Sequence, residues 1–159
     1  MILFGIDPGL ASCGFASVNI DKKNIEILDT GTFKTKQNPI EHRLKEIYDF
    51  FSEKIKQYPV NEIVIEKIFF CKNVKTALMV EEVRGILLLL SKQMDIPVFQ
   101  YTPLEVKSTL TLYGRASKLE VKLMLEKIIN TELPKSDDAC DAVAIALCHF
   151  YSNKGLINA

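Results

Sequence analysis

The chain of 159 residues contains no tryptophan, few cysteines and no hydrophobic run long enough to cross a membrane. The leucine-rich run Gly85–Leu90 lies between Arg84 and Lys92 and is far shorter than the roughly 20 residues that a bilayer requires. The N-terminus has no basic region before its apolar residues, so we expect no secretory signal peptide. We therefore expect a cytoplasmic protein with no membrane partner.

The few cysteines also limit the chemistry. Cys13, Cys71, Cys140 and Cys148 are widely separated and include no C-x-x-C pair. This spacing does not match a zinc site, and a disulfide framework would be unusual in a domain of this size. We expect free and mostly buried thiols in a reducing compartment.

An excess of charge of either sign is also missing. Lys and Arg together number 20, as do Asp and Glu, so a polyanionic partner would have to be met by a local basic patch. The 48% hydrophobic and 25% charged residues describe an ordinary globular protein. No repeat or linker interrupts the chain, so we expect a single domain spanning residues 1–159.

The hydrophobic pattern predicts a mixed α/β fold. Three strands at 1–7, 12–20 and 24–35 are joined by short links, which favours an antiparallel meander. The helical pattern then starts, with Asn38 as the expected N-cap and Pro39 in the first turn. Two further strands are expected at 61–66 and 97–101, and further helices at 73–94, 103–112, 117–130 and 136–152. Crossovers through helices favour parallel placement of the last two strands in one five-stranded sheet flanked by helices.

The expected helix at 73–94 is apolar on more than one face. A helix of this kind needs a second surface to cover it. The cover is either another subunit or the terminal helices of the same chain, and the sequence leaves both alternatives open.

Two acidic residues occur where buried strands end. Asp7 follows the first strand and precedes Pro8-Gly9, so turn chemistry alone explains it. Glu66 ends the strand Ile63–Ile65 in the same manner. If the two strands pair in parallel, these two carboxylates become neighbours.

A third acidic stretch opens the last helix, in "DDACDAVAIALCH". Asp137 and Asp138 suit the N-terminal end of the helix dipole. Asp141 lies past the first turn in a helix that is apolar nearly all round, so we expect it to have little solvated surface. Asp138 and Asp141 share one side of the helix.

Together, Asp7, Glu66, Asp138 and Asp141 can form one four-carboxylate site. Such a cluster favours Mg²⁺ or Mn²⁺, because hard cations prefer oxygen ligands. Two such ions would activate a water molecule and stabilise the leaving oxygen in phosphodiester hydrolysis.

At these residues the chain resembles the RuvC family of Holliday junction resolvases. The matching segments occur in family order: "GIDPGLASCGFA", "VIEKIFFCKN", "RG" at 84–85, "VKSTLTLYGRASKLEV" and "DDACDAVAIALCH". The resemblance implies a ribonuclease H-like fold and a homodimer that nicks two opposing strands of a four-way DNA junction, leaving 5′-phosphate and 3′-hydroxyl ends. It also implies two Mg²⁺ ions per active site, which Mn²⁺ can replace, held by the four acids with Asp7 as the bridging ligand. A junction-binding and branch-migration motor of the RuvA–RuvB type is the implied partner.

The resemblance further implies DNA-binding roles for several residues. Lys107 and Lys118 match basic positions next to the family's cleft, where they would neutralise phosphates. Arg115 is expected to add to this patch, together with Lys72 and Lys122. Phe69 matches an aromatic residue that stacks near the junction centre, whereas Phe70 is as readily a core residue.

Two departures from the family pattern affect the expected affinity for DNA. Glu81 and Glu82 replace residues that are usually neutral in relatives, and Glu120 replaces a common glutamine. The chain is also less basic than expected of a junction-binding protein.

Three other functions share some of these sequence features. A ribonuclease H-like enzyme acting on RNA or hybrids shares the same acids, and a 2′-hydroxyl requirement would distinguish it. An actin-like ATPase needs a second lobe for which 159 residues leave no room. A non-catalytic junction-binding module would tolerate loss of any one of the four acids, whereas all four are present in this chain. The two histidines, His42 and His149, are expected to be structural and do not indicate a hydrolase triad.

Overall fold

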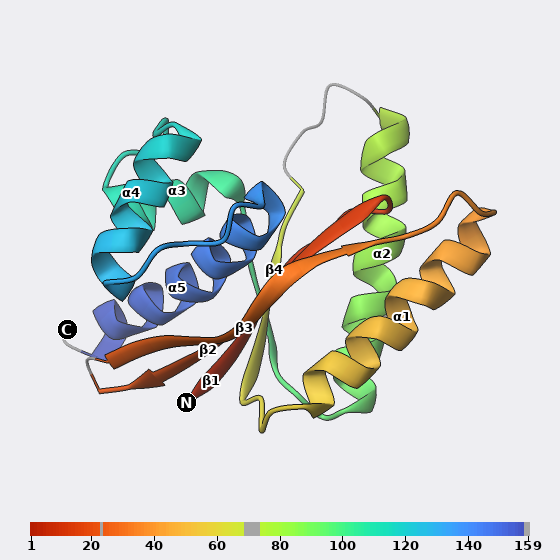
Figure 1. Ribbon diagram of the computed structural model, residues 1–159, viewed down its shortest axis with the longest axis horizontal. Helices are drawn as coiled ribbons and strands as arrows, with labels where there is room; N and C mark the ends of the chain where they lie inside the picture. Colours follow the sequence, from red (N-terminus) through yellow and green to blue (C-terminus); the bar gives the residue numbers. More distant parts are fainter. Residues whose placement is uncertain (23, 69–73, 158–159) are drawn as a thin grey trace.

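A computed structural model describes residues 1–22, 24–68 and 74–157 of the chain (Figure 1). Its centre is one five-stranded sheet in the order β3-β2-β1-β4-β5. The strands are β1 (Ile2–Asp7), β2 (Ser12–Asp21), β3 (Asn24–Lys34), β4 (Glu62–Glu66) and β5 (Val98–Tyr101). The first three pair antiparallel, whereas β4 pairs in parallel with both β1 and β5. The expected mixed sheet is therefore confirmed, because helical crossovers return β4 and β5 in the direction of β1.

Helices cover both faces of this sheet (Figure 1). Helices α1 (Ile40–Lys56) and α2 (Val74–Gln93) lie on one face. Helices α3 (Pro103–Thr111), α4 (Lys118–Ile129) and α5 (Asp137–Ile157) lie on the other. Alternate strand residues supply the two cores: Phe4 and Ile63 pack toward α1 and α2, and Leu3 and Val64 pack toward α5. Both central strands are thus buried on two sides, as their unbroken apolar runs predict.

The ends of two helices differ from the sequence-based expectation. Helix α1 has Pro39 rather than Asn38 at its N-cap, with no side-chain capping bond, so the expected cap is wrong. The amide of Asn38 instead donates to Glu46 on the first exposed turns of the helix (3.1 Å). Helix α5 runs to Ile157, five residues past its expected end at residue 152.

Helix α2 is not covered by the terminal helices of the chain. Those helices pack on the opposite face of the sheet, so that alternative is wrong (Figure 1). Helix α2 buries Val83, Leu87 and Leu90 against the sheet and α1, while Leu78 and Leu89 remain exposed at 61% and 56%. Cover by a second subunit stays a prediction.

Two of the three acidic residues that depart from the family pattern, Glu81 and Glu120, have partners within the chain. Glu81 pairs with the buried guanidinium of Arg84, which also donates to Gln100 on β5. Glu120 forms a capping box with Ser117 at the start of α4, and these hydrogen bonds hold the pKa of Glu120 below its usual range. Each carboxylate therefore has a local structural role.

Other expectations concern buried polar groups. Cys13, Cys140 and Cys148 are free and buried as expected, whereas Cys71 lies outside the described residues. His149 is wholly buried between Tyr101 and Glu62, with both contacts at 2.8 Å, which fits the structural role expected of it. In the part of the chain that the structure describes, no helix has the length and apolar character needed to span a membrane.

Candidate active site

Asp7 and Glu66 occupy the same edge of the sheet. Each is the last residue of its strand, and β1 and β4 are parallel neighbours in which Ile6 pairs with Ile65. The next residue along each strand is therefore an acid, and both carboxylates leave the sheet at its carboxyl edge. The neighbour relationship expected from the sequence is confirmed.

Two glycines allow helix α5 to approach this edge closely. A Cβ atom built on Gly5 would lie 2.1 Å from the Ala142 carbonyl oxygen, and one on Gly14 would lie 1.9 Å from that of Asp138. Only glycine fits at such distances. Gly14 also pairs with Asp7 across β1 and β2, so the first turn of α5 rests directly beside the end of β1. This approach brings Asp138 and Asp141 to Asp7 and Glu66.

The proximity of the four acids is visible in their electrostatics. The pKa of Asp7 is raised to about 8, mainly by burial and then by the charges of Glu66, Asp141 and Asp138. The charge of Lys118 opposes this shift. Burial and the charge of Asp141 raise the pKa of Glu66 to about 7. Like charges that share a desolvated site disfavour ionisation. The site is therefore short of positive charge as it stands.

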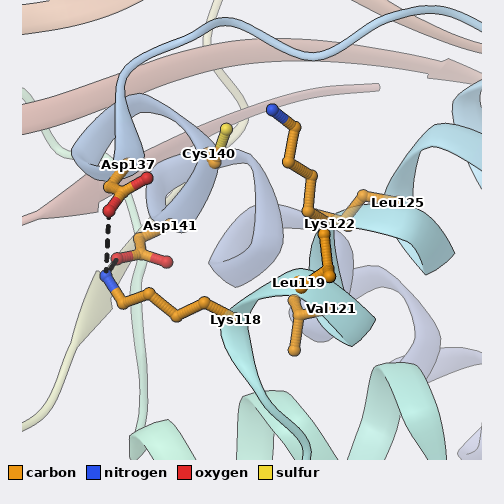
Figure 2. A pocket seen from close by; sticks show the side chains of 8 residues that line it. All are labelled: Lys118, Leu119, Val121, Lys122, Leu125, Asp137, Cys140 and Asp141. Atoms are coloured by element: carbon orange, nitrogen blue, oxygen red, sulfur yellow. Dashed lines mark hydrogen bonds and ion pairs between the residues drawn. The ribbon is translucent and has the colours of Figure 1, made fainter.

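Asp138 and Asp141 each have a hydrogen-bond donor, and Figure 2 shows the one that faces Asp141. The Ser12 hydroxyl donates to Asp138 Oδ2 at 2.5 Å, and the Lys118 ammonium donates to Asp141 Oδ2 at 3.0 Å. The bond to Asp141 is the main reason that the pKa of Lys118 is raised. Sequence reasoning missed Ser12, because a single hydroxyl at the start of a strand carries no signal of what will face it.

Asp141 is more exposed than expected. Its side chain is 33% exposed and faces α4, whereas the sequence pattern predicted little solvated surface. Asp137 is 78% exposed and lies 4.0 Å from Lys118, at the outer side of the same turn (Figure 2). Helix α4 packs on only one side of the first turn of α5, so the other side of that turn is open to solvent.

Two pockets adjoin the carboxylates. One of about 250 Å³ is lined by Glu66, Lys107, Lys118 and Asp141, with apolar side chains of α3 to α5 as its floor. Its neighbour, of about 230 Å³, lies between α4 and α5 (Figure 2). In this second pocket Lys122 extends past Cys140, away from the carboxylates (Figure 2). Lys107 and Lys118 thus lie beside the acids, as expected.

Arg115 is the other expected DNA-binding residue that the structure describes. Arg115 is exposed in the turn between α3 and α4 and lines neither pocket. Phe69, Phe70 and Lys72 fall outside the described residues, so their roles stay predictions.

The donor set suits a hard cation. All four side chains are carboxylates, and their mutual repulsion is what a divalent cation would relieve. Within residues 1–22, 24–68 and 74–157, no three His, Cys, Asp or Glu side chains converge closely enough, as they lie, to hold a metal ion. Two of the four carboxylates face Ser12 and Lys118 instead.

Comparison with known proteins identifies the family. A family model described as "Crossover junction endodeoxyribonuclease RuvC" matches residues 3–149. The chain belongs to the RuvC family. A RuvC from Pseudothermotoga lettingae is 45% identical over 151 residues, covering 94% of this chain and 93% of that protein. The RuvC of Thermotoga maritima is 42% identical over 149 residues, covering 92% and 89%.

Solved structures agree with this assignment. The T. thermophilus RuvC in complex with a Holliday junction substrate superimposes with a TM-score of 0.91 at 29% identity, covering 98% of this chain and 96% of that one. The yeast mitochondrial Holliday junction resolvase Ydc2, at 14% identity and a TM-score of 0.70, shares the fold. The fold is therefore the ribonuclease H-like fold of RuvC, and the RuvC family consists of metal-dependent nucleases.

Proposed function

We propose that residues 1–159 form one nuclease domain that resolves four-way DNA junctions by paired, symmetric nicks. The protein would act in the cytoplasm, in homologous recombination and DNA repair. The observation that carries the proposal is the placement of four electrostatically interacting acids, from β1, β4 and α5, beside two lysines at one edge of the sheet. Hydrolysis by attack of water at phosphorus would leave 5′-phosphate and 3′-hydroxyl ends.

The four acids would hold two Mg²⁺ ions, or Mn²⁺ in their place. When bound, these ions would activate the attacking water and stabilise the leaving oxygen. Asp7 occupies the centre, since the charges of the other three acids all act on it. Asp141 would exchange its bond with Lys118 for the cation, and Ser12 would keep Asp138 oriented toward Asp7.

The lysines would act on the DNA backbone. Lys107 and Lys118 line the same pocket as Glu66 and Asp141, so a phosphate entering the pocket meets two positive charges beside the acids. Release of Lys118 from Asp141 would let its ammonium neutralise that phosphate. Contacts of this kind position the strand and carry little sequence information.

Paired nicks on opposite strands require two active sites. The exposed leucines Leu78 and Leu89 of α2 offer an apolar surface on which a second copy of the chain can pack. We therefore include a homodimer in the proposal, and we expect a motor complex of the RuvA–RuvB type to deliver the junction.

The test compares three labelled substrates: a mobile four-way DNA junction, a linear duplex and an RNA–DNA hybrid. Each is incubated with Mg²⁺, Mn²⁺ or chelator, beside the Asp7→Asn variant and the exposed control Asp137→Asn. We expect paired, ligatable nicks in the junction alone, abolished by chelator and by Asp7→Asn and retained by Asp137→Asn. Cleavage of the hybrid with the junction intact would refute junction resolution and support an RNA-processing enzyme with the same acids.

A further inference from the structure

The turn between α3 and α4 presents two large apolar side chains to solvent. Leu112 is 93% exposed and Tyr113 is 57% exposed. Leu112 also adopts the left-handed backbone conformation, with φ 59° and ψ 14°. In the described part of the chain, three other non-glycine residues have positive φ: Lys22, Asp95 and Asn130. Asn and Asp tolerate this conformation, whereas a leucine there is strained and points to a function for its side chain.

The turn is held in place by its own contacts. The Leu112 N–H donates to the Ser108 carbonyl at 3.0 Å, and the Tyr113 N–H donates to the Thr111 hydroxyl at 3.2 Å. A Cβ atom on Gly114 would lie 2.7 Å from Leu104 Cδ1, so the backbone after Tyr113 is pressed against α3. The outward placement of Leu112 and Tyr113 is therefore built into the turn.

Basic residues flank this exposed pair along the chain. Lys107 lies in the last turns of α3 and faces the pocket that contains Glu66. Lys118 begins α4 and donates to Asp141. Arg115 is exposed within the turn itself. An apolar tip flanked by cations beside the active-site pocket suits nucleic acid, because phosphates meet the cations while base faces meet the apolar side chains.

We propose that Leu112 and Tyr113 pack against unstacked bases of the junction arm next to the cleaved phosphate. The inference rests on the proposed function and adds a DNA contact to it. The two side chains hold the arm by apolar contact, while Lys107, Arg115 and Lys118 hold its phosphates. A contact of this kind adds selectivity for a distorted junction over a linear duplex, whose bases remain stacked.

The test uses Leu112→Gly and the double variant Leu112→Gly/Tyr113→Ser. Glycine adopts the left-handed conformation freely, so both variants keep the turn, and the thermal midpoint of Leu112→Gly is expected to equal or exceed that of the parent. Leu123→Ser, which alters a leucine of α4 that is 49% exposed, is the matched control. Junction affinity is measured in chelator at several salt concentrations, with 2-aminopurine in the arms reporting unstacking.

We expect the double variant to bind the junction about 5- to 30-fold more weakly, the affinity change that the loss of one stacking contact produces. The slope of log affinity against log salt should stay unchanged, because apolar contacts release no counterions. Arg115→Ala should instead reduce that slope by about one. Leu123→Ser should bind as the parent does, and the 2-aminopurine signal should fall in the double variant but not in Leu123→Ser.

Unchanged junction affinity in the double variant would overturn the inference and leave a partner protein as the occupant of this surface. An equal loss in affinity for linear duplex would also overturn it. If the parent itself neither binds nor cleaves the junction, the proposed function fails, and that result is distinguishable because it needs no variant.

Discussion

Replacing Asp7 by asparagine should stabilise the metal-free protein. At pH 7 the carboxyl group of Asp7 in an unfolded chain is ionised, since its ordinary pKa is 3.8, whereas in the folded protein its pKa is about 8. At pH 7, about three units above the pKa of the unfolded chain, folding must return a proton to Asp7. At about 1.4 kcal/mol per unit, this lowers the free energy of unfolding by roughly 4 kcal/mol. This figure is an upper bound, because relaxation around the buried charge reduces it.

The direction of the pH dependence follows from the same shift. Between about pH 4 and pH 8 the folded protein holds a proton on Asp7 that the unfolded chain has released, so stability falls as pH rises. Below pH 4 both states are protonated and the cost disappears. Asparagine is neutral throughout, so the stability gain of Asp7→Asn should be near zero at pH 4 and grow to about 2–4 kcal/mol at pH 8.

The assay is urea unfolding in chelator at pH 4.5, 6, 7 and 8, with Asp137→Asn as the control. Asp137 is 78% exposed, so its replacement should change stability little at any pH. Adding Mg²⁺ at pH 8 should stabilise the parent and leave Asp7→Asn nearly unaffected. A variant less stable than the parent at pH 8 in chelator would refute the reasoning, as would a gain that does not depend on pH.

Three further variants test how the site is assembled. Gly14→Ala should destabilise the fold by at least about 1–3 kcal/mol, because its Cβ would lie 1.9 Å from the Asp138 carbonyl oxygen, and denaturant unfolding will measure it. Ser12→Ala removes the donor to Asp138 and should lower the cleavage rate roughly tenfold, with junction affinity in chelator unchanged. Ser12→Thr keeps a hydroxyl and should restore the rate. Equal rates in all three proteins would exclude a role for the hydroxyl. Leu78→Asp places a charge on the exposed face of α2 and should convert the proposed dimer to a monomer in sedimentation equilibrium, whereas an unchanged mass would place the interface elsewhere.

The sequence was sufficient to predict the sheet and the acids at its edge. Asp7 and Glu66 end apolar strands, and helical crossovers favour a parallel sheet in which such acids become neighbours if the two strands pair, as the structure shows they do. The helical position of Asp138 and Asp141 follows from the apolar stretch 139–148, which begins directly after Asp138 and contains Asp141. These predictions rest on local patterns and on a general rule of chain connection.

The partners of those acids could not be predicted in the same manner. Lys118 reaches Asp141 from 23 residues away, and Ser12 reaches Asp138 across 126 residues, so both contacts depend on how α4 and α5 pack on the sheet. The partial exposure of Asp141 has the same origin, since it is set by the gap between two helices rather than by the pattern of either. The cap of α1 differs from the expectation because the helix begins one residue later, after Pro39, and the Asn38 side chain donates to Glu46 instead of capping.

The zero net charge of the chain is compatible with binding a polyanion because its acids are not spread evenly. Four of them form the site, where a bound cation would offset their charge. Glu81 is paired with Arg84, and Glu120 caps the helix that Lys118 begins, so these two of the three acids that depart from the family pattern have partners within the chain. With cations bound, the field that a DNA backbone meets beside Glu66 would be set by the short-range balance between those cations, Lys107 and Lys118, rather than by the net charge of the whole chain. Junction affinity should accordingly rise more steeply with divalent cation concentration than the zero net charge of the chain suggests.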